Sequence, residues 1–118
     1  MIGIGGATRV FLATGPTDMR KGFEGLFALA RDRIGEDPLS GHLFVFCNAP
    51  RIRVKVLYWD GSGLWVSAKR LERGRFSWPE AVEGCARVKL GREDLVLLLG
   101  GIELDRTRRK GWHRLEPE

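Results

Sequence analysis

The chain has 118 residues, of which 43% are apolar and 30% are charged, values typical of one globular domain. This composition excludes the disordered and collagen-like classes, and the longest apolar stretch, Leu95–Leu99, is far shorter than the roughly 20 residues of a membrane span. Residues 1–6 have no basic segment and no long apolar run, so we expect no signal peptide and a cytoplasmic protein. Lys and Arg number 20 against 15 Asp and Glu, and the net charge of +5 favours an anionic partner, nucleic acid first and an acidic protein second.

Residues 8–13 are predicted to form a short strand, which the following Gly-Pro-Thr sequence ends. Apolar residues at helical spacing then predict an amphipathic helix over 19–34. Thr17 or Asp18 is its natural cap.

Two glycines weaken this predicted helix. Gly22 and Gly25 are three residues apart and would lie on one side of it. We interpret them as a place where a sheet or neighbouring backbone packs closely, with approach to a nucleic-acid backbone as the alternative.

Three strands in succession are predicted next. The segment His42–Cys47 is almost continuously apolar, as is typical of a buried central strand. Strands over 52–59 and 64–70 follow, joined by the tight turn Asp60–Gly63. Consecutive strands with short connections imply an antiparallel meander.

The C-terminal part is predicted to add a strand over 86–90 and a short helix over 92–99 that ends at Gly100. The basic segment 106–118 has little periodicity, so we expect a mobile tail after a single domain over 1–105. The predicted fold class is α+β: a small antiparallel sheet of about five strands, with the amphipathic helix packed on one face and a short C-terminal helix.

The sequence has few of the residues that catalytic sites and metal sites need. His42 and His113 are far apart in the sequence and are interpreted as surface residues. Cys47 and Cys85 are predicted to be free, mostly buried thiols rather than a disulfide. The glycine-rich segment 3–6 superficially resembles a phosphate loop, but no strand precedes it and no Lys-Ser or Lys-Thr follows, so we interpret it as a flexible end.

A metal-dependent nuclease needs several carboxylates around one Mg²⁺, and Asp18, Asp60 and Asp94 are the only plausible trio. Each has an ordinary structural explanation. Asp60 lies in a turn that favours Asp, and the other two lie where the first turns of helices prefer acids. We therefore expect no metal site, no cofactor and no enzymatic activity.

The region 51–78 is strongly basic and carries the main functional hypothesis. If Asp60 pairs with Gly63 across the turn, Arg53 lies opposite Arg70 on one face of the hairpin. Two directly opposed like charges disfavour strand pairing unless an anion lies between them, and a phosphate suits the bidentate geometry of Arg. The residues predicted to contact phosphates are Arg53, Lys55, Lys69, Arg70, Arg73 and Arg75.

Aromatic side chains are interleaved with these cations. Tyr58, Trp65 and Trp78 are candidates for stacking on bases, with core packing as the alternative. An aromatic and basic sheet face is one way to bind single-stranded nucleic acid and equally a way to bind a protein.

Four segments carry a family resemblance: TDMRKGF at 17–23, GHLFVF at 41–46, KVLYWDG at 55–61 and KRLERGRFSWP at 69–79. Together they resemble the small accessory proteins called TnpB of the insertion sequence 66 group of bacterial mobile elements, over about residues 8–103. These are distinct from the longer RNA-guided nuclease of the same name. The resemblance implies a protein encoded beside a DDE-type transposase and a second small accessory protein, and needed for movement of the element. It supplies no catalytic residue.

Two functions are therefore expected. The first is an accessory factor in transposition that binds nucleic acid, the DNA of the mobile element, through the basic aromatic sheet surface. The second is an adaptor that binds the transposase or its small partner protein without contacting DNA. A metal-dependent nuclease is a remote third.

Overall fold

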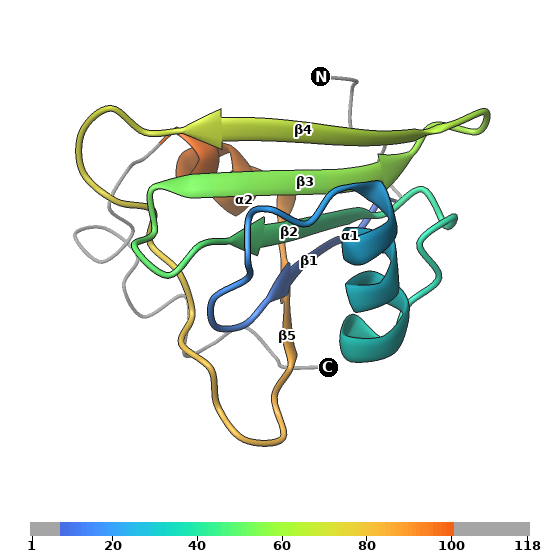
Figure 1. Cartoon of the computed structure of the whole chain (residues 1–118), viewed down its shortest axis with the longest axis horizontal. Coiled ribbons are helices and arrows are strands. Elements are labelled where there is room, and N and C mark those ends of the chain that lie inside the picture. Colours follow the sequence, from blue (N-terminus) through green and yellow to red (C-terminus); the bar gives the residue numbers. More distant parts are fainter. Residues whose placement is uncertain (1–7, 101–118) are drawn as a thin grey trace.

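The computed structural model describes residues 8–100, which form a five-stranded sheet with helices packed on it (Figure 1). The predicted glycine-rich end, His113 and the predicted tail 106–118 lie outside the described residues. Within 8–100 no helix is long and apolar enough to cross a membrane. The elements in chain order are β1 (Val10–Ala13), α1 (Phe23–Leu29), the π-helical turn η1 (Ala30–Ile34), β2 (Leu43–Cys47), β3 (Arg53–Trp59), β4 (Leu64–Arg70), β5 (Arg87–Leu90) and α2 (Arg92–Leu99).

The strand order is β4-β3-β2-β1-β5, and the α+β class is confirmed. β2, β3 and β4 form the predicted antiparallel meander. The sheet is mixed rather than wholly antiparallel, because β1 and β2 pair in parallel. The physical reason is the connection between them: the helical segment 23–34 carries the chain back across the sheet, so β2 starts at the same end as β1.

Each face of the sheet has its own hydrophobic core, because side chains alternate along the strands. The helix α1 lies in front of the sheet in Figure 1, where it buries Leu26 on what we call the α1 face. Ala30 of η1 is buried in the same cluster. The helix α2 lies behind it and buries Leu95 and Leu98 on the α2 face. The prediction placed a helix on one face only; in the structure the short C-terminal helix covers part of the other.

The helix α1 starts later than predicted. Its N-cap is Gly22, which has no side chain to cap the helix, so the expected cap by Thr17 or Asp18 is wrong. Asp18 instead accepts hydrogen bonds from the backbone and guanidinium of Arg20. Neither glycine lies against a strand: a Cβ at Gly22 would meet nothing within 4 Å, and one at Gly25 would meet the Lys21 side chain at 3.0 Å.

The histidine and cysteines near the sheet serve its packing. Both cysteines are free thiols, as predicted; Cys47 is buried and Cys85 is partly buried. Burial raises the pKa of Cys47 to about 11. His42 is not a plain surface residue, because its Nδ1 accepts a hydrogen bond from the Arg9 backbone at 3.0 Å and its ring meets Phe11 edge-on.

Candidate nucleic-acid interface

The hairpin of β3 and β4 has the register that its turn predicts. Asp60 Oδ1 accepts hydrogen bonds from the backbone N–H groups of Ser62 and Gly63 at 2.8 and 2.9 Å. Its Oδ2 accepts one from Trp65 Nε1 at 2.6 Å. These donors, the indole first, hold the pKa of Asp60 far below its usual range. The expected structural role of this carboxylate in the turn is confirmed.

Arg53 and Arg70 are cross-strand partners on the α1 face, as predicted. Both are exposed, and they line a groove of about 400 Å³. We call this groove the arginine trough; its lining comprises Met19, residues 53–55 and residues 68–70. A neighbouring hollow of about 500 Å³ shares Met19 and Arg53 with it and extends toward the loop before α1.

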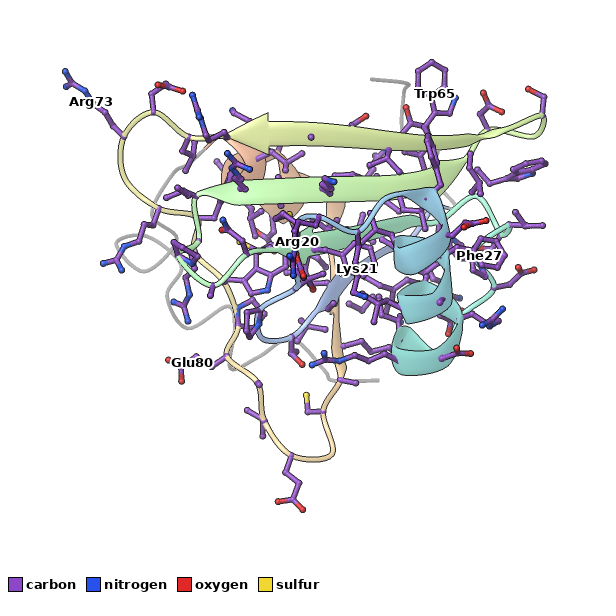
Figure 2. The ribbon with its side chains drawn as sticks, in the orientation of Figure 1. Arg20, Lys21, Phe27, Trp65, Arg73 and Glu80 are labelled. Carbon is purple, nitrogen blue, oxygen red and sulfur yellow. The ribbon has the colours of Figure 1, made fainter. Side chains whose placement is uncertain are left out.

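Lys55 lies on the same face, but its ammonium has a structural partner. Its Nζ donates a hydrogen bond of 2.9 Å to the main-chain carbonyl of Lys21, 34 residues away in sequence. This bond ties β3 to the loop that precedes α1. Figure 2 labels Lys21 on that loop, between Arg20 and the helix. Lys55 therefore supports a wall of the trough.

Lys69 lies on the opposite face from the arginine pair, because it is one residue away from Arg70 on β4. Its Nζ donates a hydrogen bond of 2.7 Å to the main-chain carbonyl of Leu99, the last residue of α2. A cation at this position satisfies a free carbonyl and complements the negative end of the helix dipole. The cations predicted to contact phosphates therefore do not all lie on one face of the sheet.

Arg73 and Arg75 lie on the loop between β4 and β5 and are exposed. Figure 2 shows Arg73 extending from this loop away from the sheet. Arg51, at the turn between β2 and β3, has a left-handed backbone with φ of 64° and lies 3.7 Å from Glu80. None of these three arginines lines the arginine trough.

Two of the three aromatic candidates are core residues. Tyr58 is 1% exposed and Trp78 is 4% exposed, and both belong to the cluster on the α2 face. Trp78 Nε1 donates a hydrogen bond of 2.9 Å to the main-chain carbonyl of Ala13. Their assignment as stacking residues is corrected, because a base has no access to a buried ring. Trp65 is 48% exposed, and its ring lies parallel to Tyr58 with centroids 6.0 Å apart.

The three carboxylates of the hypothetical metal site have separate roles. Hydrogen bonds from the side chain and backbone of Arg20 lower the pKa of Asp18 to about 2. The prediction that Asp18 lies in a first helical turn is wrong, whereas Asp94 does lie in the first turn of α2. Within residues 8–100 no group of three His, Cys, Asp or Glu side chains is arranged to hold a metal ion.

Sequence reasoning did not assign Met19 or Arg20 to the interface. Met19 lines both hollows, and Arg20 lines the second, where Figure 2 shows it in front of the sheet. No spacing rule relates residue 19 to residue 53, because their proximity depends on the tertiary course of the loop before α1. The one signal in the sequence is that 17–23 is among the four family-like segments.

Comparison with known proteins identifies the family. The family described as IS66 Orf2 like protein matches residues 8–109, and the chain belongs to it. Similar relatives from Sinorhizobium fredii are the uncharacterized protein y4jC, 38% identical over 93% of this chain and 92% of its own length, and the uncharacterized protein y4hO, 41% identical over 87% and 88%. No solved structure matches the chain. Membership in this family gives the protein an accessory role in the transposition of an insertion sequence.

Proposed function

We propose that this IS66 Orf2-like chain binds nucleic acid through the arginine trough, as an accessory factor acting on the DNA of its mobile element in the cytoplasm. The observation that carries the proposal is the direct cross-strand pairing of Arg53 and Arg70 in an open groove. The role is one of binding, in concert with the transposase and the second small accessory protein of the element.

The charge balance around the arginine pair supports an anionic ligand. Arg70 has one acidic neighbour, Glu72, at 3.3 Å, and both side chains are more than half exposed. Such a pair in water contributes little. Arg53 makes no ion pair with any other described residue. Two guanidinium groups that face each other across a strand pair repel, and an anion between them relieves the repulsion.

The chemistry of the pair favours phosphate among anions. A guanidinium group presents a rigid fork of N–H donors that matches two phosphate oxygens, and it keeps its charge at every physiological pH. Contacts of this kind position a protein on a nucleic-acid backbone without reading its sequence. The trough alone therefore supports affinity for nucleic acid, and sequence preference would need other residues.

The experiment is a titration of duplex and single-stranded DNA across salt concentrations with two double variants. Arg53→Ala/Arg70→Ala removes the trough arginines, and Arg73→Ala/Arg75→Ala removes the same charge from the loop after β4. Each lost phosphate contact lowers the slope of log K against log salt by about 0.9 on duplex DNA and 0.7 on a single strand. We expect the trough variant to lose about 1.8 or 1.4 in slope for every sequence, and the loop variant to lose less.

Comparing the two double variants shows whether DNA binding depends on the position of the removed arginines or only on the net charge of the protein. Equal losses in both would mean that overall charge, and not the trough, binds the DNA, and the proposal would be wrong. The trough variant is expected to stay folded, because it removes a repulsive cross-strand pair.

A second candidate function is an adaptor that binds the transposase or its small partner. The observation that favours it is a hollow of about 300 Å³ lined by Phe23, Phe27 and Leu64, in which Phe23 is 53% exposed. Exposed apolar surface of this kind is typical of protein contacts. The adaptor role takes precedence if the protein binds its transposase at every salt concentration and shows no measurable affinity for DNA.

A further inference from the structure

The strand β4 forms one edge of the sheet, which makes its outer side available for pairing. The strand order ends at β4, so it has β3 on one side and no strand of residues 8–100 on the other (Figure 1). It is seven residues long, and most of it is exposed or half-exposed. A long edge strand is a template for pairing with another chain.

The hydrogen bonds at the two ends of the hairpin show which backbone groups face outward. Asp60 N–H donates to the Gly63 carbonyl, and Leu71 N–H donates to the Ile52 carbonyl. Hydrogen-bonded and non-hydrogen-bonded pairs alternate along an antiparallel ladder. Every second residue of β4 therefore directs its N–H and C=O away from β3. These residues are Leu64, Val66, Ala68 and Arg70.

We infer that two copies of this chain pair antiparallel through the free edge of β4, about a two-fold axis at Ser67. This is the one antiparallel register in which all four outward-facing residues bond to one another. Leu64 pairs with Arg70 of the partner subunit, and Val66 pairs with Ala68 of the partner subunit. The contact is isologous and closed, so it gives a dimer with one continuous sheet.

The distribution of charge along the edge favours the antiparallel direction. Cations on an edge strand usually prevent pairing, but here Lys69 and Arg70 both lie at one end of β4. The other end carries Trp65 and, beside it, the ionised Asp60. An antiparallel copy brings opposite ends together, whereas a parallel copy would place the cations side by side.

The pair at each end of the interface has a specific chemistry. Residue 65 lies opposite residue 69 of the partner subunit, on the α2 face. Figure 2 shows Trp65 extending beyond β4, and its ring is backed by Tyr58 and held by Asp60. The partner's Lys69 can lay its stem on this ring and its ammonium near the carboxylate. An ammonium has three N–H donors, so its bond to Leu99 leaves two.

The dimer also has a geometric consequence that rests on the proposed function. Opposite residues in a strand pair face the same side of the sheet, so both arginine troughs would open on one side of the dimer. The two Arg70 positions would be six residues apart along the strands, roughly 20 Å. One nucleic-acid ligand would then contact both troughs.

The test is sedimentation of the full chain over a wide micromolar range, without DNA, for the wild type, three variants of the edge strand and one control variant. Trp65→Lys places a lysine opposite Lys69 of the partner subunit. Lys69→Glu places a carboxylate near Asp60 of the partner subunit. Each change occurs twice in a two-fold interface, so we expect the dimer dissociation constant of each single variant to rise at least about tenfold. The double variant Trp65→Lys/Lys69→Glu opposes unlike charges and is expected to regain the dimer.

Rescue by the double variant cannot come from within one chain. Residues 65 and 69 of the same strand are four residues apart, about 13 Å, which is too far for an ion pair. Val82→Lys, an equally drastic change at an exposed loop residue, controls for the added lysine and should leave the dimer intact. Thermal melts establish that each variant is folded.

Several outcomes overturn the inference. These are a wild type that is monomeric at every concentration, single variants that dimerise like the wild type, or a folded double variant that stays monomeric. A monomeric wild type whose single variants lose binding to the transposase would assign the edge to that partner instead. Because DNA is absent, none of these results depends on the proposed nucleic-acid binding.

Discussion

Replacing Trp65 and Trp78, one at a time, by phenylalanine separates a core role from a ligand-binding role. Trp78→Phe keeps an aromatic face but removes the indole N–H that bonds the Ala13 carbonyl inside the protein. Trp65→Phe makes the same chemical change at a ring that is 48% exposed. Both changes remove an indole N–H donor, but the Trp78 bond is buried, whereas the Trp65 bond to the Asp60 carboxylate is exposed to water.

The expected size of the effect follows from the surroundings of each ring. At Trp78, which is 4% exposed, the lost hydrogen bond costs about 1 kcal/mol, and the cavity left by the smaller ring adds about 1–2 kcal/mol. We therefore expect the free energy of unfolding to fall by about 2–3 kcal/mol, a large share of the roughly 5–15 kcal/mol of a typical domain. The loss in Trp65→Phe should be clearly smaller, because water replaces its contacts.

The assay is urea unfolding followed by circular dichroism, with DNA titration of each folded variant. We expect Trp78→Phe to bind DNA as the wild type does under conditions where it is folded. The reasoning is refuted if Trp78→Phe has wild-type stability but reduced DNA affinity, because the ring would then contact the ligand. Equal destabilisation by the two variants would also contradict it.

Two further predictions concern titratable groups. The pKa of Asp60 is lower in the folded than in the unfolded chain, so its contribution to stability is present above the ordinary carboxyl pKa of about 4 and is lost as the pH falls below it. The melting temperature of Asp60→Asn should therefore fall less on acidification than that of the wild type, and parallel curves would contradict this. Cys47 is buried and its pKa is raised to about 11, so it should react slowly with a thiol reagent at neutral pH. In the native state Cys85→Ser, which keeps Cys47, should be labelled more slowly than Cys47→Ser, which keeps Cys85. Both variants should react in denaturant. Rapid labelling of native Cys85→Ser would show that Cys47 is accessible.

The sequence was informative where local chemistry decides the structure. The turn at Asp60 fixes the hairpin, and the two-residue period of strands then fixes every partner from Trp59 opposite Leu64 to Arg53 opposite Arg70. The end of α2 is equally local, since Gly100 follows the last apolar residue and the helix ends there.

Features that depend on distant parts of the chain were not predictable in this way. The parallel pairing of β1 and β2 depends on how the helical segment 23–34 crosses the sheet. The start of α1 depends on which groups hydrogen-bond to Asp18. Its carboxylate accepts from the Arg20 guanidinium instead of capping the helix. Composition and spacing are equally compatible with parallel or antiparallel pairing of β1 and β2, and with either role of Asp18.

At the candidate site, the number of basic residues in the sequence does not show which of them are available to a ligand. Lys55 and Lys69 are each bonded to a main-chain carbonyl at least 30 residues away in sequence, which no count of basic residues can reveal. The Lys55 bond ties β3 to the loop before α1, and the Lys69 bond ties β4 to the last residue of α2, so both ammonium groups already have a partner within the fold. The guanidinium groups of Arg53 and Arg70 have no comparable partner among the described residues, although they repel each other. Because Lys55 and Lys69 bond to main-chain carbonyls while Arg53 and Arg70 oppose each other in an open groove, we expect the ligand-binding charge to be concentrated in the arginine trough. Arg73→Ala/Arg75→Ala is the decisive control, because it removes the same charge outside the trough.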